Sequence, residues 1–148
     1  MIEALGIQGG SVNKSTLYGT LAYTITTFPL AVIWHVVLFE NEYKAFGYFN
    51  GEPSFALGFL TILIQGLVLS FLFPFVKFSG ASIKRGLKYC AVLGLFFWTS
   101  HVLALLAKQA MPEPWSFALM ESLYLLIQFG IYGCCLGLIF KKQLDKNA

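Results

Sequence analysis

The stretch PWSFALMESLYLLIQFGIYGCCLGLIF, residues 114–140, decides the fold of this chain. It is almost wholly apolar and carries a single formal charge, on Glu121. An α-helix rises about 1.5 Å per residue, so about 20 apolar residues cross a hydrocarbon core about 30 Å thick. A segment of this length and composition therefore predicts a membrane-spanning helix.

Three further stretches have the same character. Residues 15–39 and 89–107 each contain one histidine and no Asp, Glu, Lys or Arg, and residues 53–76 contain none of these five residue types. The sequence predicts four spans, at residues 17–39, 54–76, 88–107 and 115–140. The 148 residues leave no length for a separate soluble domain, so we expect one all-α domain over residues 1–148, an integral membrane four-helix bundle.

Basic residues are concentrated in the segments that would lie on one side of the membrane. These segments hold Lys14, Lys77, Lys84, Arg85, Lys88, Lys141, Lys142 and Lys146, whereas the other two loops hold only Lys44 and Lys108. The positive-inside rule then places both termini and the middle loop in the cytoplasm. The net charge of +3 reflects this asymmetry, so we expect the lipid bilayer and not nucleic acid as a partner.

The two halves of the sequence share a pattern. The second predicted span opens with PSFAL at residues 53–57, and the fourth opens with PWSFAL at residues 114–119. A tryptophan and a histidine lie late in each preceding span: Trp34 with His35, and Trp98 with His101. The pattern indicates either two duplicated hairpins in parallel repeat or chance recurrence, since apolar helices draw on few residue types.

Polar side chains recur at helical spacing in each span, and we expect these stripes to face one another. Counting residues from the helix ends places His35, His101 and Glu121 within about one helical turn of each other in depth, toward the outer side. Thr61 lies at a comparable depth, and two glutamines lie about a turn deeper. The candidate ligand-binding residues are His35, His101, Glu121, Thr61, Gln65, Tyr124 and Gln128.

Each of these residues has a plainer interpretation. A buried carboxylate in lipid costs several kcal/mol unless it is paired, hydrated or protonated, so Glu121 is either a structural partner of a histidine or part of a binding cluster. The histidines are interfacial anchors or ligands, and the glutamines are interhelical hydrogen bonds or ligands. The aromatic loop at residues 40–53 is expected to lie in the headgroup layer and to cap the cluster.

Residues 94–140 contain Trp98-x-x-His101, a Pro-Glu-Pro-Trp turn at residues 112–115 and a glycine-rich last helix. With Trp34 and Gln65, this pattern resembles small bacterial four-helix integral membrane proteins of uncharacterised families. The resemblance covers most of the chain. It implies the four-helix architecture and a location in the bacterial inner membrane, and it carries over no catalytic residue.

Three functions remain open at this point. The first is a small transport-type or sensing protein that binds a proton, metal ion or small ligand in the outer polar cluster, with a homodimer expected. The second is an accessory subunit of a larger membrane complex, with the GxxxG pair Gly133 and Gly137 as its contact surface if it faces outward. The third is an electron-transfer protein with haem between His35 and His101.

Enzymatic chemistry and redox cysteines are not expected. The sequence shows no nucleophile–base pair, two-carboxylate site, zinc spacing or P-loop, so a hydrolase is disfavoured. Cofactor binding is expected only if the two histidines hold haem or a metal ion. Cys90, Cys134 and Cys135 are interpreted as small buried side chains, since adjacent cysteines on a helix rarely bridge.

Overall fold

The computed structural model describes residues 14–49 and 51–142, and all regular structure in them is helical. Four helical segments are long and apolar enough to cross a membrane: Lys14–Leu38, Phe55–Phe75, Ser82–Lys108 and Pro114–Ile139. The expected all-α architecture with four long apolar helices is therefore confirmed. The third segment begins at Ser82 and not at residue 88, because its basic first turns are helical and not part of a loop.

The first long segment is α1 (Lys14–Val32) continued by the π-helical turn η2 (Ile33–Leu38). Its threonines bond back to the chain: Thr20 Oγ1 donates to the Thr16 carbonyl at 2.8 Å, and Thr24 Oγ1 donates to the Thr20 carbonyl at 2.9 Å. By donating to a carbonyl of its own helix, a threonine hydroxyl forms a hydrogen bond where no water is present. Pro29 lies inside α1, where its missing N–H removes one backbone bond.

The second long segment follows a short helix, α2 (Glu40–Ala45), and a loop. It consists of α3 (Phe55–Leu72) and the 3₁₀ turn η3 (Phe73–Phe75). Ser54 caps α3 because its hydroxyl accepts a hydrogen bond from the Leu57 N–H. The buried positions of α3 are Ile62, Gly66, Leu69 and Ser70.

The third segment is α4 (Ser82–Trp98), the π-helical turn η4 (Thr99–Leu103) and α5 (Ala104–Lys108). The fourth is the single helix α6 (Pro114–Ile139), with proline in its first turn, where a fixed φ and a missing N–H fit the helix. A π-turn inserts an extra residue into the helical repeat and is often found at functional sites. The two π-turns, η2 and η4, contain His35 and His101 respectively, so the histidine positions of the two halves correspond in structure as well as in sequence.

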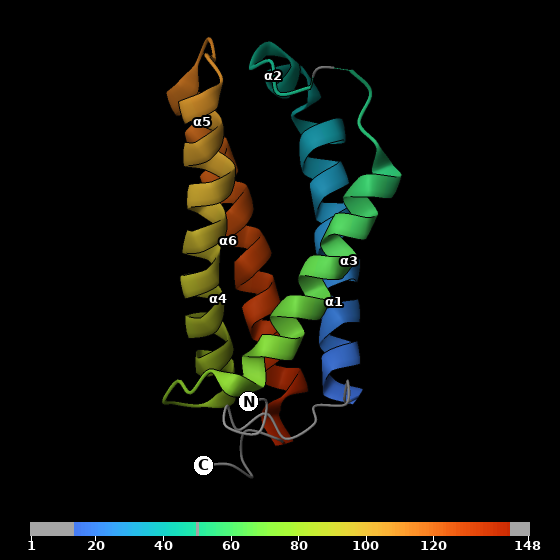
Figure 1. Ribbon diagram of the computed structural model, residues 1–148, viewed down its shortest axis with the longest axis vertical. Helices are drawn as coiled ribbons and strands as arrows, with labels where there is room; N and C mark the ends of the chain where they lie inside the picture. Colours follow the sequence, from blue (N-terminus) through green and yellow to red (C-terminus); the bar gives the residue numbers. More distant parts are fainter. Residues whose placement is uncertain (1–13, 50, 143–148) are drawn as a thin grey trace, which may run out of the picture.

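The helices form two pairs, α1 with α3 and α4 with α6, which join where α1 packs on α6 (Figure 1). Helix α3 is inclined, so that it meets α4 only near its C-terminal end. There the Tyr89 hydroxyl donates to the Leu69 carbonyl at 2.8 Å, and the rings of Phe73 and Tyr89 lie 5.1 Å apart. At the opposite end, which carries α2 and is called the α2 end below, α3 leans away from α4 (Figure 1).

Glycines allow α4 and α6 to approach closely. A β-carbon at Gly137 would lie 2.5 Å from the Cα of Ile83, and one at Gly86 would lie 2.9 Å from the backbone nitrogen of Gly137. Gly133 packs on the same turn of α4. The GxxxG pair therefore faces into this bundle and not outward. The GxxxG surface, which would have contacted a partner subunit if it faced outward, is instead covered by α4.

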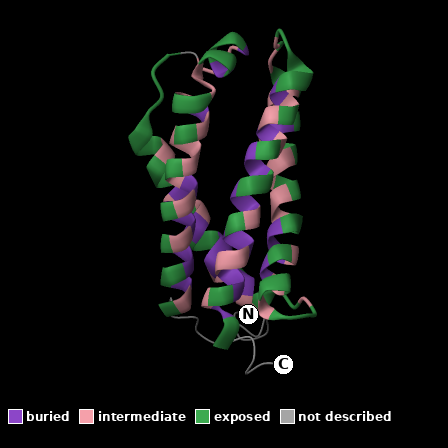
Figure 2. Cartoon of the chain, turned by 180° about the vertical axis from the view of Figure 1, so that it is seen from behind, coloured by how far each residue is buried: buried purple, intermediate pink, exposed green. Residues whose placement is uncertain are grey.

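Buried residues form an inward stripe along the helices, and the outer surfaces are exposed (Figure 2). The exposed outer residues are largely apolar: Leu95 is 62% exposed, Leu119 63% and Leu126 71%. A water-soluble monomer rarely presents so continuous an apolar surface. The surface matches helices that are built to lie in lipid.

Candidate functional site

Glu121 occupies the interior near the α2 end of the bundle. Helix α6 places it two turns from Pro114, and the side chain is 0% exposed. Among the described residues no lysine or arginine pairs with it. A carboxyl group in such a place must be satisfied by hydrogen bonds from neighbouring groups.

Two histidines bind the two oxygens of this carboxyl group. Nε2 of His35 lies 2.9 Å from Oε1 of Glu121, and Nε2 of His101 lies 2.8 Å from Oε2. The π-turn η2 of the first long segment and the π-turn η4 of the third each bring one ring to α6. The His35 side chain is 11% exposed, whereas the His101 side chain is 37% exposed.

A tyrosine from the short helix α2 completes the cluster. The Tyr43 hydroxyl donates to Oε1 of Glu121 at 2.5 Å and accepts from Nε1 of Trp34 at 2.9 Å. Tyr43 is 0% exposed although it follows the first long segment by only a few residues. Helix α2 therefore folds back over the end of the bundle. The group of Glu121, His35, His101 and Tyr43 is called the Glu121 cluster below.

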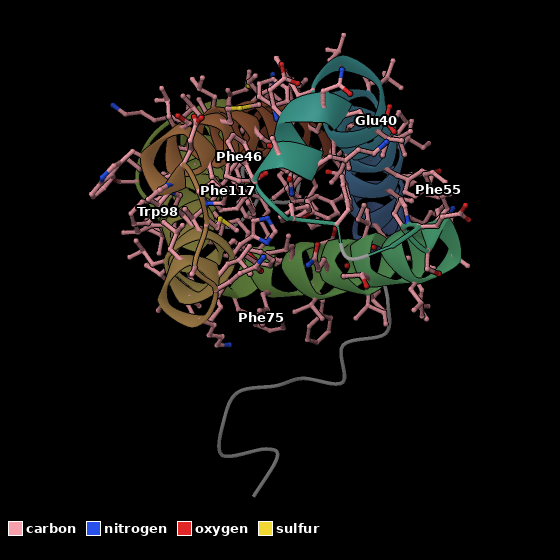
Figure 3. All side chains as sticks on the ribbon, turned by 90° about the horizontal axis from the view of Figure 1, so that it is seen from above. Glu40, Phe46, Phe55, Phe75, Trp98 and Phe117 are labelled. Carbon is pink, nitrogen blue, oxygen red and sulfur yellow. The ribbon has the colours of Figure 1, made fainter. Side chains whose placement is uncertain are left out.

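The position of α2 is fixed by packing against α6. Phe46 at the end of α2 and Phe117 in the first turn of α6 have ring centroids 5.8 Å apart, and they lie next to each other in the end-on view (Figure 3). The Gln109 side-chain amide also donates to the Gly47 carbonyl at 2.7 Å, which ties the two loops of this end together. The expected cap over the cluster is present, and it covers the cluster with Tyr43.

The hydrogen bonds of His35 determine where its protons lie. Nδ1 is 2.9 Å from the main-chain oxygen of Ala31, which can only accept, so Nδ1 carries a proton. The contact of Nε2 with Oε1 of Glu121 also needs one proton, on the imidazole or on the carboxyl group. The pair is thus an imidazolium with a carboxylate, or a neutral imidazole that accepts from a carboxylic acid.

The contact between His101 and Glu121 adds a further proton. It too joins a ring nitrogen to a carboxyl oxygen, at 2.8 Å, and one proton must lie between them. Glu121, His35 and His101 therefore hold at least three protons: one on Nδ1 of His35 and one in each histidine–carboxyl contact. With three protons the set is neutral overall, and a fourth on Nδ1 of His101 would make it positive.

The tyrosines of the cap respond to the buried carboxyl group. Burial raises the pKa of Tyr43, and the negative charge of Glu121 and its hydrogen bond raise it further. Burial and the charge of Glu121 likewise raise the pKa of Tyr48. Both hydroxyls therefore keep their protons well above neutral pH, so Tyr43 remains a hydrogen-bond donor to the carboxyl group.

A second polar layer lies one to two turns deeper in the bundle. The Tyr23 hydroxyl accepts from Nε2 of Gln128 at 2.6 Å and donates to Oε1 of Gln65 at 3.1 Å. Tyr23 is 0% exposed, and the two amides come from α3 and α6. The plain interpretation of Gln65 and Gln128 as interhelical hydrogen bonds describes this layer, with Tyr23 as their common partner.

Tyr124 lies between the two layers, one turn after Glu121 on α6. Its ring meets the ring of His35 edge to face, with centroids 4.6 Å apart. It also lines a cavity of about 270 Å³ whose wall includes His35, His101 and Tyr48. Among the described residues no hydrogen bond joins the Tyr124 hydroxyl to another group.

Thr61 does not join the cluster. Its side chain is exposed, and its hydroxyl donates to the Leu57 carbonyl of its own helix at 2.8 Å. The buried face of α3 passes through Ile62, which is one residue after Thr61, and continues through Gly66. A shift of one residue turns a helical side chain by about 100°, and counting depth alone does not fix this rotation.

Sequence reasoning missed two hydrogen-bonding residues. Tyr23 lies three residues after Thr20 and four before Thr27, so the helical spacing of polar side chains in the first span could have identified it. Tyr43 was assigned to the cap, but its bond to Glu121 depends on the fold-back of α2, for which the sequence has no local signal.

The two halves of the bundle contribute unequally. When the SFAL segments of α3 and α6 are aligned, Phe59 occupies the sequence position that corresponds to Glu121. Phe59 is 45% exposed and lies against Phe28. Both halves thus provide a histidine, but only the second half provides the carboxyl group that both histidines bind.

The hydrogen bonds limit what the site can hold without rearrangement. Both Nε2 atoms contact Glu121 and Nδ1 of His35 contacts Ala31, so ligation of haem by the two histidines would require these bonds to break. Within residues 14–49 and 51–142, no group of three or more His, Cys, Asp or Glu is arranged to hold a metal ion. Cys90 is buried, and Cys134 and Cys135 are partly buried free thiols.

Comparison of the chain with protein-family models, with curated proteins and with solved structures finds no match.

Proposed function

We propose that this chain is a membrane-spanning protein that binds a proton in the Glu121 cluster, in a transport-type or sensing role. One observation carries the proposal. A carboxyl group with 0% exposure has a histidine on each oxygen, and the hydrogen bonds of the three side chains need at least three protons.

This number exceeds what the same groups hold when they are separate. Free in water at pH 8, a glutamate side chain carries no proton and a histidine carries about one, so the three groups together hold about two. The cluster therefore binds about one proton more than its parts. Loss of that proton must break one hydrogen bond between a histidine and the carboxyl group of Glu121. Because these bonds join η2 and η4 to α6, the binding of the proton is linked to the positions of these elements.

The charges at the two ends of the bundle support a membrane orientation. The end opposite α2 carries Lys77, Lys84, Arg85, Lys88, Lys141 and Lys142, and the α2 end carries the acidic residues Glu40, Glu42, Glu52 and Glu113. We propose that the basic end faces the cytoplasm and that the α2 end faces the outside of a bacterial inner membrane. The Glu121 cluster then lies in the outer half of the membrane.

Proton binding can be measured directly because the chain has only two histidines. We would label histidine with ¹⁵N, place the protein in lipid nanodiscs, and record NMR spectra from pH 6 to pH 9 together with the infrared carboxylic-acid band. At pH 8 the wild-type protein should show either a doubly protonated imidazole or a protonated carboxyl group. A His101→Gln variant assigns the signals.

Glu121→Gln is the decisive variant, because the amide has nearly the same shape and no acidic proton. Both the extra imidazole proton and the carboxyl band should vanish at pH 8 in this variant. If wild-type protein at pH 8 shows two singly protonated imidazoles and no carboxylic-acid band, the proposal is wrong. A stoichiometric metal ion or a haem absorption band in the same sample would show that the Glu121 cluster binds a metal ion or haem and not a proton.

A further inference from the structure

The cavity beside the Glu121 cluster combines apolar walls with a few polar groups. Its volume is about 270 Å³, slightly below the range of about 300–1,000 Å³ that is common for small-molecule sites. Phe28 of α1, Phe49 of the loop and Phe55 of α3 contribute aromatic rings to the wall. His101, Tyr48 and Tyr124 contribute the polar groups.

These polar groups have hydrogen-bonding capacity that the described part of the chain does not use. Tyr124 is 6% exposed and Tyr48 is partly buried, and neither hydroxyl has a partner among the described residues. Nδ1 of His101 is similarly unbonded, because only its Nε2 contacts Glu121. Both hydroxyl oxygens keep some accessible surface, since the one fully buried side-chain oxygen without a partner in the described part of the chain is Oγ1 of Thr27. Because both tyrosines line the cavity, their hydroxyls can donate to a polar atom of a ligand there.

The cavity is open beside α3. Gly58 lines it, and a β-carbon added at Gly58 would meet no atom within 4 Å. The N-terminal half of α3 leans away from α4 at this end, and Phe55 at its start is 50% exposed (Figures 1 and 3). A molecule dissolved in the surrounding lipid could therefore reach the cavity from the side, along α3.

We infer that this cavity binds a small neutral molecule with one or two aromatic rings and a carbonyl or hydroxyl oxygen. The aromatic walls suit a flat apolar ring. The unpaired tyrosine hydroxyls can donate to an oxygen atom of the ligand. A charged ligand is disfavoured because it would lose its hydration among apolar walls, while Glu121 already has three donors.

This inference rests on the cavity and its unpaired hydroxyls, not on the number of protons in the Glu121 cluster. The two proposals share only the rings of His35 and His101 as a common wall. Either can therefore fail while the other stands, and different measurements test them.

The experiment compares two probes of similar shape, 2-acetylnaphthalene with a carbonyl oxygen and 2-ethylnaphthalene without one. Each is dialysed against nanodiscs with and without the protein, so that partition into lipid is subtracted. The wild-type protein should retain saturable excess 2-acetylnaphthalene, about one molecule per chain. Loss of one neutral hydrogen bond weakens binding by about five- to tenfold, and the hydrocarbon should bind more weakly by this factor.

Gly58→Leu should fill the cavity without disturbing the fold, because no atom lies near the new β-carbon and leucine favours a helix. It should reduce retention of the ketone at least tenfold. Gly130→Leu is the matched control: Gly130 also has no atom within 4 Å of an added β-carbon, but it lines an apolar groove of about 460 Å³ between α4 and α6. Retention should be unchanged in this variant.

Tyr124→Phe removes one proposed donor and keeps the ring. It should weaken binding of 2-acetylnaphthalene about five- to tenfold and leave binding of 2-ethylnaphthalene unchanged. Equal retention by the wild-type protein and Gly58→Leu would overturn the inference, as would loss of retention in Gly130→Leu. Absence of any saturable excess in the wild-type protein would also overturn it.

Discussion

At the scale of the residue, Tyr43 connects the cap of the bundle to its buried carboxyl group. The Tyr43 hydroxyl accepts a hydrogen bond from the Trp34 N–H and donates one to Glu121. A single hydroxyl therefore satisfies polar groups of two long helical segments. When Glu121 is ionised, its negative charge makes the bond from Tyr43 stronger than one between neutral groups. Loss of the Tyr43 hydroxyl would lower stability chiefly because its partners, Trp34 and Glu121, would stay buried with fewer hydrogen bonds.

Tyr43→Phe should lower stability by about 1–3 kcal/mol, because it leaves the Trp34 N–H without an acceptor and removes one of the two donors to Oε1 of Glu121. Thermal unfolding in nanodiscs, followed by circular dichroism, would measure the loss. Tyr18→Phe is the control, since Tyr18 is 56% exposed on α1. Equal stability of the two variants would show that the Tyr43 bond contributes nothing.

The raised pKa values of Tyr43 and Tyr48 predict how stability depends on alkaline pH. An unfolded tyrosine ionises near pH 10, whereas these two keep their protons to higher pH in the folded state. Their contribution is therefore complete below about pH 10 and is lost as pH rises from there toward the folded pKa. Between pH 9 and 11, Tyr43→Phe should lose less stability than the wild-type protein does.

Absorbance at 295 nm checks the same prediction. In the folded protein near pH 10.5 the variant and the wild type should show equal tyrosinate absorbance, since Tyr43 does not contribute. Ionisation of Tyr43 in the folded protein near pH 10 would contradict the assignment.

At the scale of the element, glycine spacing sets how closely α4 and α6 pack, and thereby how close His101 comes to Glu121. Gly86, Gly133 and Gly137 bring the two backbones together at the end opposite α2. In lipid, where apolar side chains gain little by leaving their solvent, such close contact is a main source of helix association. The π-turn η4 then directs His101 toward α6 at the other end.

Gly137→Ala should destabilise the protein by about 1–3 kcal/mol, because the added methyl group would overlap the backbone of Ile83 and force the helices apart. Gly130→Ala, in the same helix, meets no atom and should be neutral or slightly stabilising. Unfolding in detergent titrations would compare the two variants. A neutral Gly137→Ala would mean that α4 and α6 do not pack through these glycines.

At the scale of the whole molecule, the bundle is closed where α1 meets α6 and open where α3 leans from α4. Two identical hairpins related by a twofold axis would make these two junctions alike, and the structure shows that they differ. The position of the first half that aligns with Glu121 holds Phe59, which has no carboxyl group. One half therefore carries the acidic group, and the other half borders the cavity beside it.

The proposed membrane orientation predicts opposite labelling at the two ends. In intact bacterial cells, Glu42→Cys should react with a membrane-impermeant maleimide, because this exposed residue of α2 would face outside. Lys84→Cys, exposed at the basic end, should react only after the cells are lysed. The wild-type protein gives the background of Cys90, Cys134 and Cys135. The reverse labelling pattern would invert the orientation.

The sequence predicted part of the site because depth along a helix is a matter of counting. His35, His101 and Glu121 were grouped because they lie on polar stripes at helical spacing and at similar depth, and the structure brings their polar atoms within 2.9 Å. Thr61 was included on the same grounds, but the buried face of α3 passes through Ile62 and Gly66 and leaves Thr61 exposed. Tyr43 needed the course of α2, which depends on packing of Phe46 against Phe117, distant in the chain.

The sequence by itself determined four long apolar helices, their basic and acidic loops, and a lone carboxyl group within one of them, because length and composition are local properties of the chain. Only the tertiary structure decided that both histidines meet this carboxyl group and that α3 leaves a cavity beside it. It also decided that the hydrogen bonds of Glu121, His35 and His101 together require at least three protons. These features depend on how each helix is rotated and tilted against its neighbours. Contacts between distant residues set those angles, and no single segment encodes them.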